Sequence, residues 1–180
     1  MKKKAGYIRG FELDPTAPLK RSHVEKLLLA IWDEHSARLR SSFAATQEYG
    51  LSKNEDAKNF LRREVYALGL ALQRSPPKWN VAELITSSRA HQTTRADVLK
   101  NNVFQALFMG IYNEDDQISR QERWVMAREL EYAARHHVPP EFLCGFVYQS
   151  GGRKNLLKKL GADYREPAFR DQAPDNDPPA

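Results

Sequence analysis

The sequence predicts an all-α protein: a bundle of six to seven mainly antiparallel helices with a basic extended N-terminal arm and a disordered C-terminal tail. Three observations predict this class. Apolar residues recur at helical spacing, a capping residue followed three positions later by an acid occurs five times, and strand patterns are nearly absent. The 180 residues fit one helical domain over 20–161, with the arm at 1–19 and the tail at 162–180.

The helix starts are marked by a side chain that can accept a hydrogen bond from a free N–H of the first turn. The acid three positions later can bond back or favour the positive end of the helix. The pairs are Ser22–Glu25, Ser52–Glu55, Asn80–Glu83, Thr94–Asp97 and Ser119–Glu122.

The first half of the chain predicts three helices. Apolar positions beginning with Val24, Leu27 and Leu28 predict a helix over about 23–45. The same spacing predicts a second helix over about 53–74, which Pro76 and Pro77 stop. A short third helix follows over about 81–90.

The second half predicts helices over about 95–112, 120–136 and 140–149, and then a short basic helix before Gly161. Pro139 and Pro140 end one helix and open the next. The aromatic residues at helical spacing are expected in the core: Trp32, Phe43, Phe60, Phe104, Phe108, Trp124, Phe142 and Phe146. Tyr7, Trp79 and Tyr164 lie outside the periodic runs; they are the predicted candidates for base stacking, or equally surface aromatics that cover the end of the bundle.

Composition limits the class of protein. Mean hydropathy is -0.66, no apolar run is long enough to span a bilayer, and no apolar stretch follows the basic N-terminus as it would in a signal peptide. With one cysteine, Cys144, no internal disulfide is possible. We therefore expect a cytoplasmic protein without a membrane span. No cofactor motif is present, so none is expected.

The formal net charge is +5, and the bases gather towards the two ends of the chain. Such an excess can contact a phosphate backbone, or it can serve solubility alone. The leading hypothesis is a non-catalytic subunit of a larger nucleoprotein assembly, with nucleic acid and protein partners, RNA and DNA both open. Small helical subunits of CRISPR surveillance complexes are similar in size, charge and helicity. The expected phosphate contacts are Lys2, Lys3, Lys4, Lys20, Arg21, Arg62, Arg63, Arg153, Lys154, Lys158 and Lys159.

An acidic loop, "YNEDDQISRQE" at 112–122, is a second candidate site. It is not a calcium EF-hand loop, because starting at Asn113 or Asp115 leaves no glycine at position six and no Glu at position twelve. A plain turn between two capped helices explains its length and its Ser119 cap.

The same loop carries a family resemblance. Asp115, Asp116, Ile118, Ser119 and Glu122, followed by "VPPEFL" at 138–143, resemble the TerB-like helical module of tellurite-resistance proteins over roughly 99–147. The family's loop has Asp-Gly where this chain has Asp115-Asp116. The resemblance implies a metal-associated adaptor that binds a protein partner, linked to membranes or stress. Asp115, Asp116 and Glu122 would then be the metal ligands.

A third alternative is an enzyme of unrecognised type that uses Cys144 with His136 or His137. The neighbours of Cys144 in "EFLCGFVY" are apolar, which favours a buried, inert thiol. The spacing also lacks the CxxC or HxxxH pattern of a zinc site. The sequence therefore favours a non-catalytic protein.

Overall fold

The chain is described from a computed structural model, which describes residues 19–40, 53–74, 79–86, 102–111, 118–162 and 164–167. These residues are all helical or irregular, and no strand occurs among them, so the predicted all-α class is confirmed. The elements in order are α1 (Arg21–Arg40), α2 (Lys53–Arg74), α3 (Val81–Thr86), α5 (Val103–Ile111), α6 (Arg120–Arg135), the 3₁₀ turn η3 (Pro140–Phe142), α7 (Leu143–Gln149) and α8 (Gly152–Gly161).

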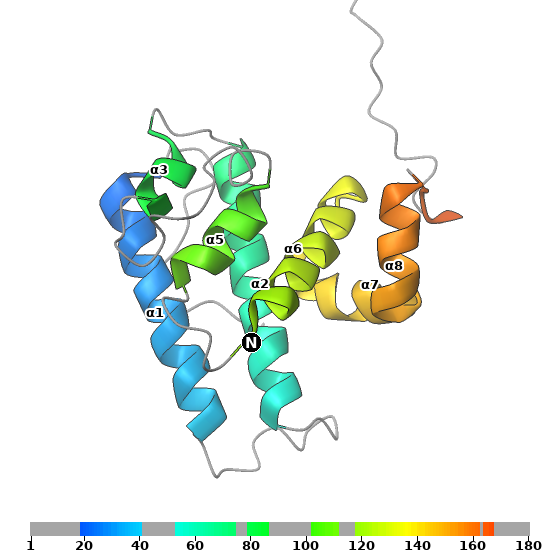
Figure 1. Cartoon of the computed structure of the whole chain (residues 1–180), viewed down its shortest axis with the longest axis horizontal. Helices are drawn as coiled ribbons and strands as arrows, with labels where there is room; N and C mark the ends of the chain where they lie inside the picture. Colours follow the sequence, from blue (N-terminus) through cyan, green and yellow to red (C-terminus); the bar gives the residue numbers. More distant parts are fainter. Residues whose placement is uncertain are drawn as a thin grey trace, which may run out of the picture.

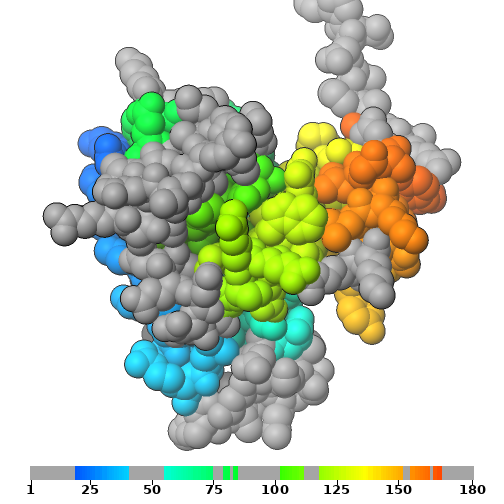
Figure 2. Space-filling view, viewed as in Figure 1, coloured from blue at the N-terminus to red at the C-terminus, as the bar shows by residue number. Residues whose placement is uncertain are grey.

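The helices form two groups around α2 (Figure 1). On one side, α1 runs antiparallel to α2, and α5 crosses both of them with α3 packed against it. On the other side, α6 packs against α2 and α5 and also contacts α7 and α8. In the space-filling view, α6 lies between the α1 side and α8, which forms the outer edge (Figure 2). No described helix is long and apolar enough to cross a membrane.

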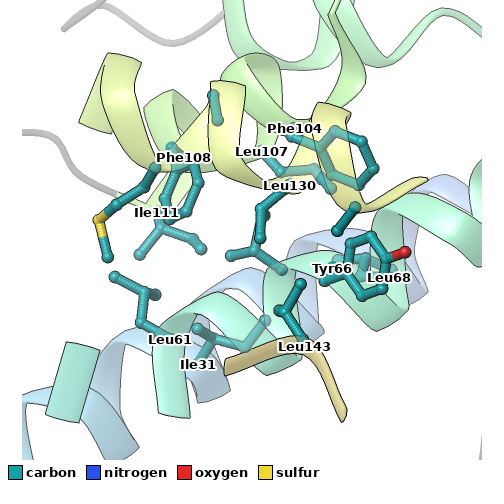
Figure 3. Close-up of a cluster of buried hydrophobic side chains, with 14 of the residues drawn as sticks. Ile31, Leu61, Tyr66, Leu68, Phe104, Leu107, Phe108, Ile111, Leu130 and Leu143 are labelled. Atoms are coloured by element: carbon teal, nitrogen blue, oxygen red, sulfur yellow. The ribbon is translucent and has the colours of Figure 1, made fainter. Parts of the chain in front are cut away.

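One hydrophobic core joins these helices. Its largest fully buried side chains include Tyr66, Phe104, Phe108 and Tyr132. Figure 3 shows the aromatic and aliphatic side chains of α5 facing those of α2 across this core. The Tyr66 hydroxyl donates to the Val138 carbonyl oxygen at 2.8 Å, so the buried phenol is satisfied and also ties α2 to the segment after α6.

The crossing of α2 and α5 depends on a glycine. A Cβ at Gly69 would lie 2.6 Å from Cδ1 of Phe104, far inside van der Waals contact. The ring of Phe104 also stacks on Tyr66, with centroids 5.7 Å apart. Gly69 therefore lets the ring of Phe104 rest directly on the α2 backbone.

Several helix ends differ from the prediction. Ser22 lies inside α1, which begins at Arg21, so its predicted capping role is wrong. The carbonyl of Lys20 accepts the first bonds instead, from the N–H groups of His23 and Val24. Of the predicted helix over 95–112, residues 95–101 and 112 lie outside the described residues. Asn102 is irregular, so α5 begins at Val103, and the Asn102 side chain caps it by accepting from the Gln105 N–H at 3.0 Å. Ser119 does cap α6, where its Oγ accepts from the Glu122 N–H.

Helix α6 ends through its own backbone hydrogen bonds, ahead of Pro139 and Pro140. His137 has φ 51, and the N–H groups of His137 and Val138 donate to the carbonyls of Ala134 and Ala133. This is a Schellman motif, which usually places glycine at the left-handed position. Pro139 then sits one residue beyond the motif and η3 begins at Pro140.

Two aromatic residues predicted in the core lie at the surface. Trp124 is 40% exposed and Phe142 is 65% exposed. Phe142 belongs to η3, whose tighter winding puts it off the 3.6-residue register on which the prediction depended. Phe60, Phe104, Phe108 and Phe146 are buried as predicted, while Phe43 lies outside the described residues.

The predicted arm and tail lie mostly outside the described residues, since 1–18 and 168–180 are not described. At the domain edge, the Trp79 indole donates to the Leu19 carbonyl oxygen at 2.9 Å, which ties the start of α1 to α3. Residues 164–167, within the predicted tail, contact the domain through Glu166, as detailed below.

Candidate nucleic-acid interface

Helix α8 carries the strongest local basic charge among the described elements. Its sequence, GRKNLLKKLG, has four bases and no acid. Leu156 is fully buried and Leu160 packs against the core, which fixes the helix to the domain and leaves Lys158 exposed. Arg153 and Lys154 belong to the first turn of the same helix, and their side chains lie outside what the structure describes.

The turn into α8 is tight. Ser150 ends α7, its N–H donating to the Phe146 carbonyl, and Gly151 adopts φ 94, a left-handed conformation in which an L side chain would be strained. The N–H of Gly151 donates to the carbonyl oxygen of Tyr148 at 3.3 Å. This turn therefore brings the end of α7 beside the start of α8.

Helix α7 buries one face and exposes the other. Leu143, Phe146 and Val147 are buried, Cys144 is partly buried against α2, and Gly145, Tyr148 and Gln149 are exposed. Tyr148 is 86% exposed, and Gly145 has no atom within 4 Å of the place where a Cβ would be. Sequence reasoning did not identify Phe142 and Tyr148 as exposed aromatic residues. The signal available was that both lie off the stripe that Leu143, Phe146 and Val147 define.

Lys159, predicted as a phosphate contact, is partly buried and bonded to neighbours within the protein. Its Nζ donates to the carboxylate of Glu166 at 2.6 Å and to the Ser150 carbonyl oxygen at 3.0 Å. The Tyr132 hydroxyl donates to the same Glu166 oxygen at 2.9 Å. Burial alone would raise the pKa of Glu166, but the hydrogen bonds from Lys159 and Tyr132 and the Lys159 charge outweigh it, so this pKa is lowered. Lys159 thus serves to hold residues 164–167.

His136 also bonds to Glu166. The four residues Tyr132, His136, Lys159 and Glu166 together hold the segment after α8 against α6, and we call them the C-terminal clasp. The His136 ring is almost fully buried. Its Nε2 accepts from the Glu166 N–H at 2.9 Å, and its Nδ1 therefore carries the proton and donates to the Tyr132 carbonyl oxygen at 2.8 Å. Burial is the main cause that lowers the pKa of His136. Burial and the Glu166 hydrogen bond raise the pKa of Tyr132.

Arg62 and Arg63 are also engaged with neighbours. Arg62 is mostly buried and donates to Glu129 at 2.9 Å, with Glu55 and Asn59 as further acceptors. Its guanidinium joins α2 to α6 across the core edge. Arg63 is partly buried, with Nη1 3.9 Å from the Cys144 sulfur. We therefore leave Arg62 and Lys159 out of the contact set proposed below.

The other predicted basic contacts are not gathered around α8. Lys20 and Arg21 are exposed at the start of α1, on the side of the molecule away from α8 (Figure 1), and Arg21 pairs with Glu25 at 3.2 Å. Lys2, Lys3 and Lys4 lie outside the described residues, as does Tyr7. Of the other predicted stacking residues, Trp79 is partly buried and Tyr164 lies beneath Lys159, whose Nζ is 5.2 Å from the ring centroid.

The acidic loop is described only in part. Asp115 and Asp116 lie outside the described residues. Glu122 is in α6, where its carboxylate pairs with Lys58 at 2.6 Å. Within the described segments, no group of three or more His, Cys, Asp and Glu side chains is arranged to hold a metal ion. The Lys58 pair gives Glu122 a structural role that links α2 to α6.

The surroundings of Cys144 oppose its use as a nucleophile. Burial raises the pKa of the thiol, and the nearby Arg63 and Arg62 only partly offset this. The sulfur lies 3.7 Å from the Asn59 carbonyl oxygen, while both ring nitrogens of His136 are taken up by the clasp. An activated thiolate needs the opposite environment.

No protein-family model matches the chain, and neither a curated protein nor a solved structure matches it significantly.

Proposed function

We propose that this protein is a non-catalytic nucleic-acid-binding subunit of a larger nucleoprotein assembly, and that α8 contacts the phosphate backbone. The observation that carries the proposal is the charge of α8: four bases, no acid, and a place at the outer edge of the molecule (Figure 2). Phosphate contacts by Lys and Arg dominate nucleic-acid affinity and require no particular base sequence.

The proposed contact set is smaller than the predicted one. It consists of Arg153, Lys154 and Lys158 on α8, because Lys159 is neutralised by Glu166. Lys158 supports the proposal best, since its side chain is exposed one turn before the end of the helix. The exposed Lys20 and Arg21 lie too far around the bundle to belong to the same contact and would meet a different part of a long strand or a protein partner.

The test is fluorescence anisotropy with labelled single-stranded RNA, single-stranded DNA and duplex DNA at several salt concentrations. The triple variant Arg153→Ala, Lys154→Ala and Lys158→Ala should bind at least tenfold more weakly. The slope of log K against log salt should also shrink by about 2, since three single-strand contacts are lost.

The matched control removes three exposed bases elsewhere: Lys26→Ala, Arg74→Ala and Arg120→Ala. Both variants lower the net charge by the same three units, so a general effect of charge would weaken nucleic-acid binding equally in the two. The proposal predicts that only the α8 variant binds nucleic acid more weakly and shows a smaller slope of log K against log salt. Equal losses, or binding that vanishes near 150 mM salt in every protein, would contradict it.

A further inference from the structure

We infer that the exposed face of α7, formed by Phe142, Gly145 and Tyr148, is a stacking platform for unpaired bases of a single strand whose phosphates lie along α8. This inference rests on the proposed function and adds the class of nucleic acid and the residues that would select it.

The first argument is the position of the aromatic rings. Single exposed apolar residues are common, but here two large ones lie on one short segment, with Tyr148 86% and Phe142 65% exposed. The spacing 142, 145 and 148 places all three residues on one side of η3 and α7. Gly145 lies between these two residues along the chain, and the space above it is open. A flat base can therefore reach the backbone between them.

The second argument is charge. Tyr148 is joined by the Gly151 turn to the start of α8, a helix whose sequence has four bases and no acid and on which Lys158 is exposed. A polyanion lying on α8 would thus bring its bases to Tyr148. Glu141 is exposed beside Phe142 and would repel phosphate there, so the backbone should pass on the α8 side of the rings.

The same charge argues against a second copy of this chain as the occupant. Two copies meeting through this face would bring two basic α8 helices together, and such like-charge contact is unfavourable. Aromatic rings beside basic residues are instead the combination that binds single strands, with stacking worth about 1–3 kcal/mol for each base. In a duplex the bases are already stacked on one another, so the rings would contribute little.

The experiment compares a ten-nucleotide oligo-uridine or oligo-thymidine with a duplex of equal length. Tyr148→Ala should weaken single-strand binding roughly tenfold and leave duplex binding within twofold. Tyr148→Phe should bind like the wild type, because the ring is retained. Phe142→Ala should give a smaller loss, and Leu29→Ala, which removes an equally exposed side chain from α1, should give none. Thermal unfolding of each variant should be unchanged within about 2 °C, which separates binding from folding.

The outcomes distinguish this inference from the proposed function. If Tyr148→Ala binds as the wild type does while the α8 triple variant is weakened, the platform is wrong and the phosphate contact stands. Poly-glutamate that competes as well as oligo-uridine would mean that the face binds acidic protein, which also overturns the inference. If the wild type binds none of the nucleic acids at physiological salt, the proposed function and the inference fall together.

Discussion

His136 is held between α6 and the segment after α8 by both of its ring nitrogens. Protonation of Nε2 would replace an acceptor with a donor and point it at the Glu166 N–H, 2.9 Å away. The charged groups around the ring are Glu166, which favours protonation, and Arg135 and Arg165, which oppose it. Because burial is the largest cause and lowers the pKa, the folded clasp requires the neutral ring.

This predicts that acid opens the C-terminal clasp. The unfolded state binds a proton on His136 below its ordinary pKa of 6.5, while the folded state resists it, so stability is full above that pH and falls below it. The pKa of Glu166 is also lowered in the folded state, so its carboxylate stabilises the fold while it is ionised. That stabilisation is lost at lower pH, as the carboxylate is protonated. We expect the Glu166 amide to lose hydrogen-exchange protection between pH 7 and 5.

His136→Gln should be less stable at pH 7 by about 1 kcal/mol and should show a weaker dependence on pH in this range. His23→Gln, which changes an exposed histidine on α1, should keep the wild-type dependence. Equal pH profiles for the wild type and His136→Gln would show that the clasp does not sense this proton.

At this scale the sequence predicts which residues are basic but not which are free. Arg62 and Lys159 look like surface bases in the pattern, yet their partners are Glu129, 67 positions away, and Glu166, in a segment without periodicity. Such pairs depend on how helices pack, which a helical repeat does not specify. The exposed Tyr148 was missed for the opposite reason, because an apolar residue in an apolar run is normally assigned to the core.

At the scale of elements, the α2–α5 crossing depends on one missing side chain. Gly69→Ala should destabilise the fold by roughly 1–3 kcal/mol, since the new methyl group overlaps Phe104 and either the ring or α5 must shift. Gly145→Ala should instead stabilise it by up to about 1 kcal/mol, because alanine favours the helix and its site is open. Urea unfolding of the two variants measures both effects. A Gly69→Ala protein as stable as the wild type would show that α5 has room to move.

Helix existence could be predicted well, and helix ends less well. Repeats of apolar residues at 3.6 spacing reflect burial against neighbours, so they mark α1, α2, α5 and α6 reliably. Ends depend on individual hydrogen bonds. Ser119 caps α6 as predicted, but Ser22 does not cap α1, and His137 ends α6 in the left-handed conformation, which is uncommon for a residue other than glycine.

At the scale of the whole molecule, a single core supports two different outer edges. The side with α1 and α3 carries mixed charge, whereas the side with α7 and α8 combines exposed rings with a helix that has only basic charge. Net charge alone could predict an affinity for polyanions but not its location. The proposed location depends on the packing of Leu156 into the core, which turns Lys158 outwards, and on Glu166, whose ion pair takes Lys159 out of the proposed contact set.

The most direct measurement of this account is the mapping of a nucleic-acid titration onto the backbone. Isotope-labelled protein would be titrated with oligo-uridine at physiological salt and followed by amide chemical shifts. The account predicts progressive shifts over η3, α7 and α8, from about 141 to 162, with α1 and α3 unchanged. Shifts confined to the start of α1, spread evenly over all exposed bases, or absent throughout would contradict it.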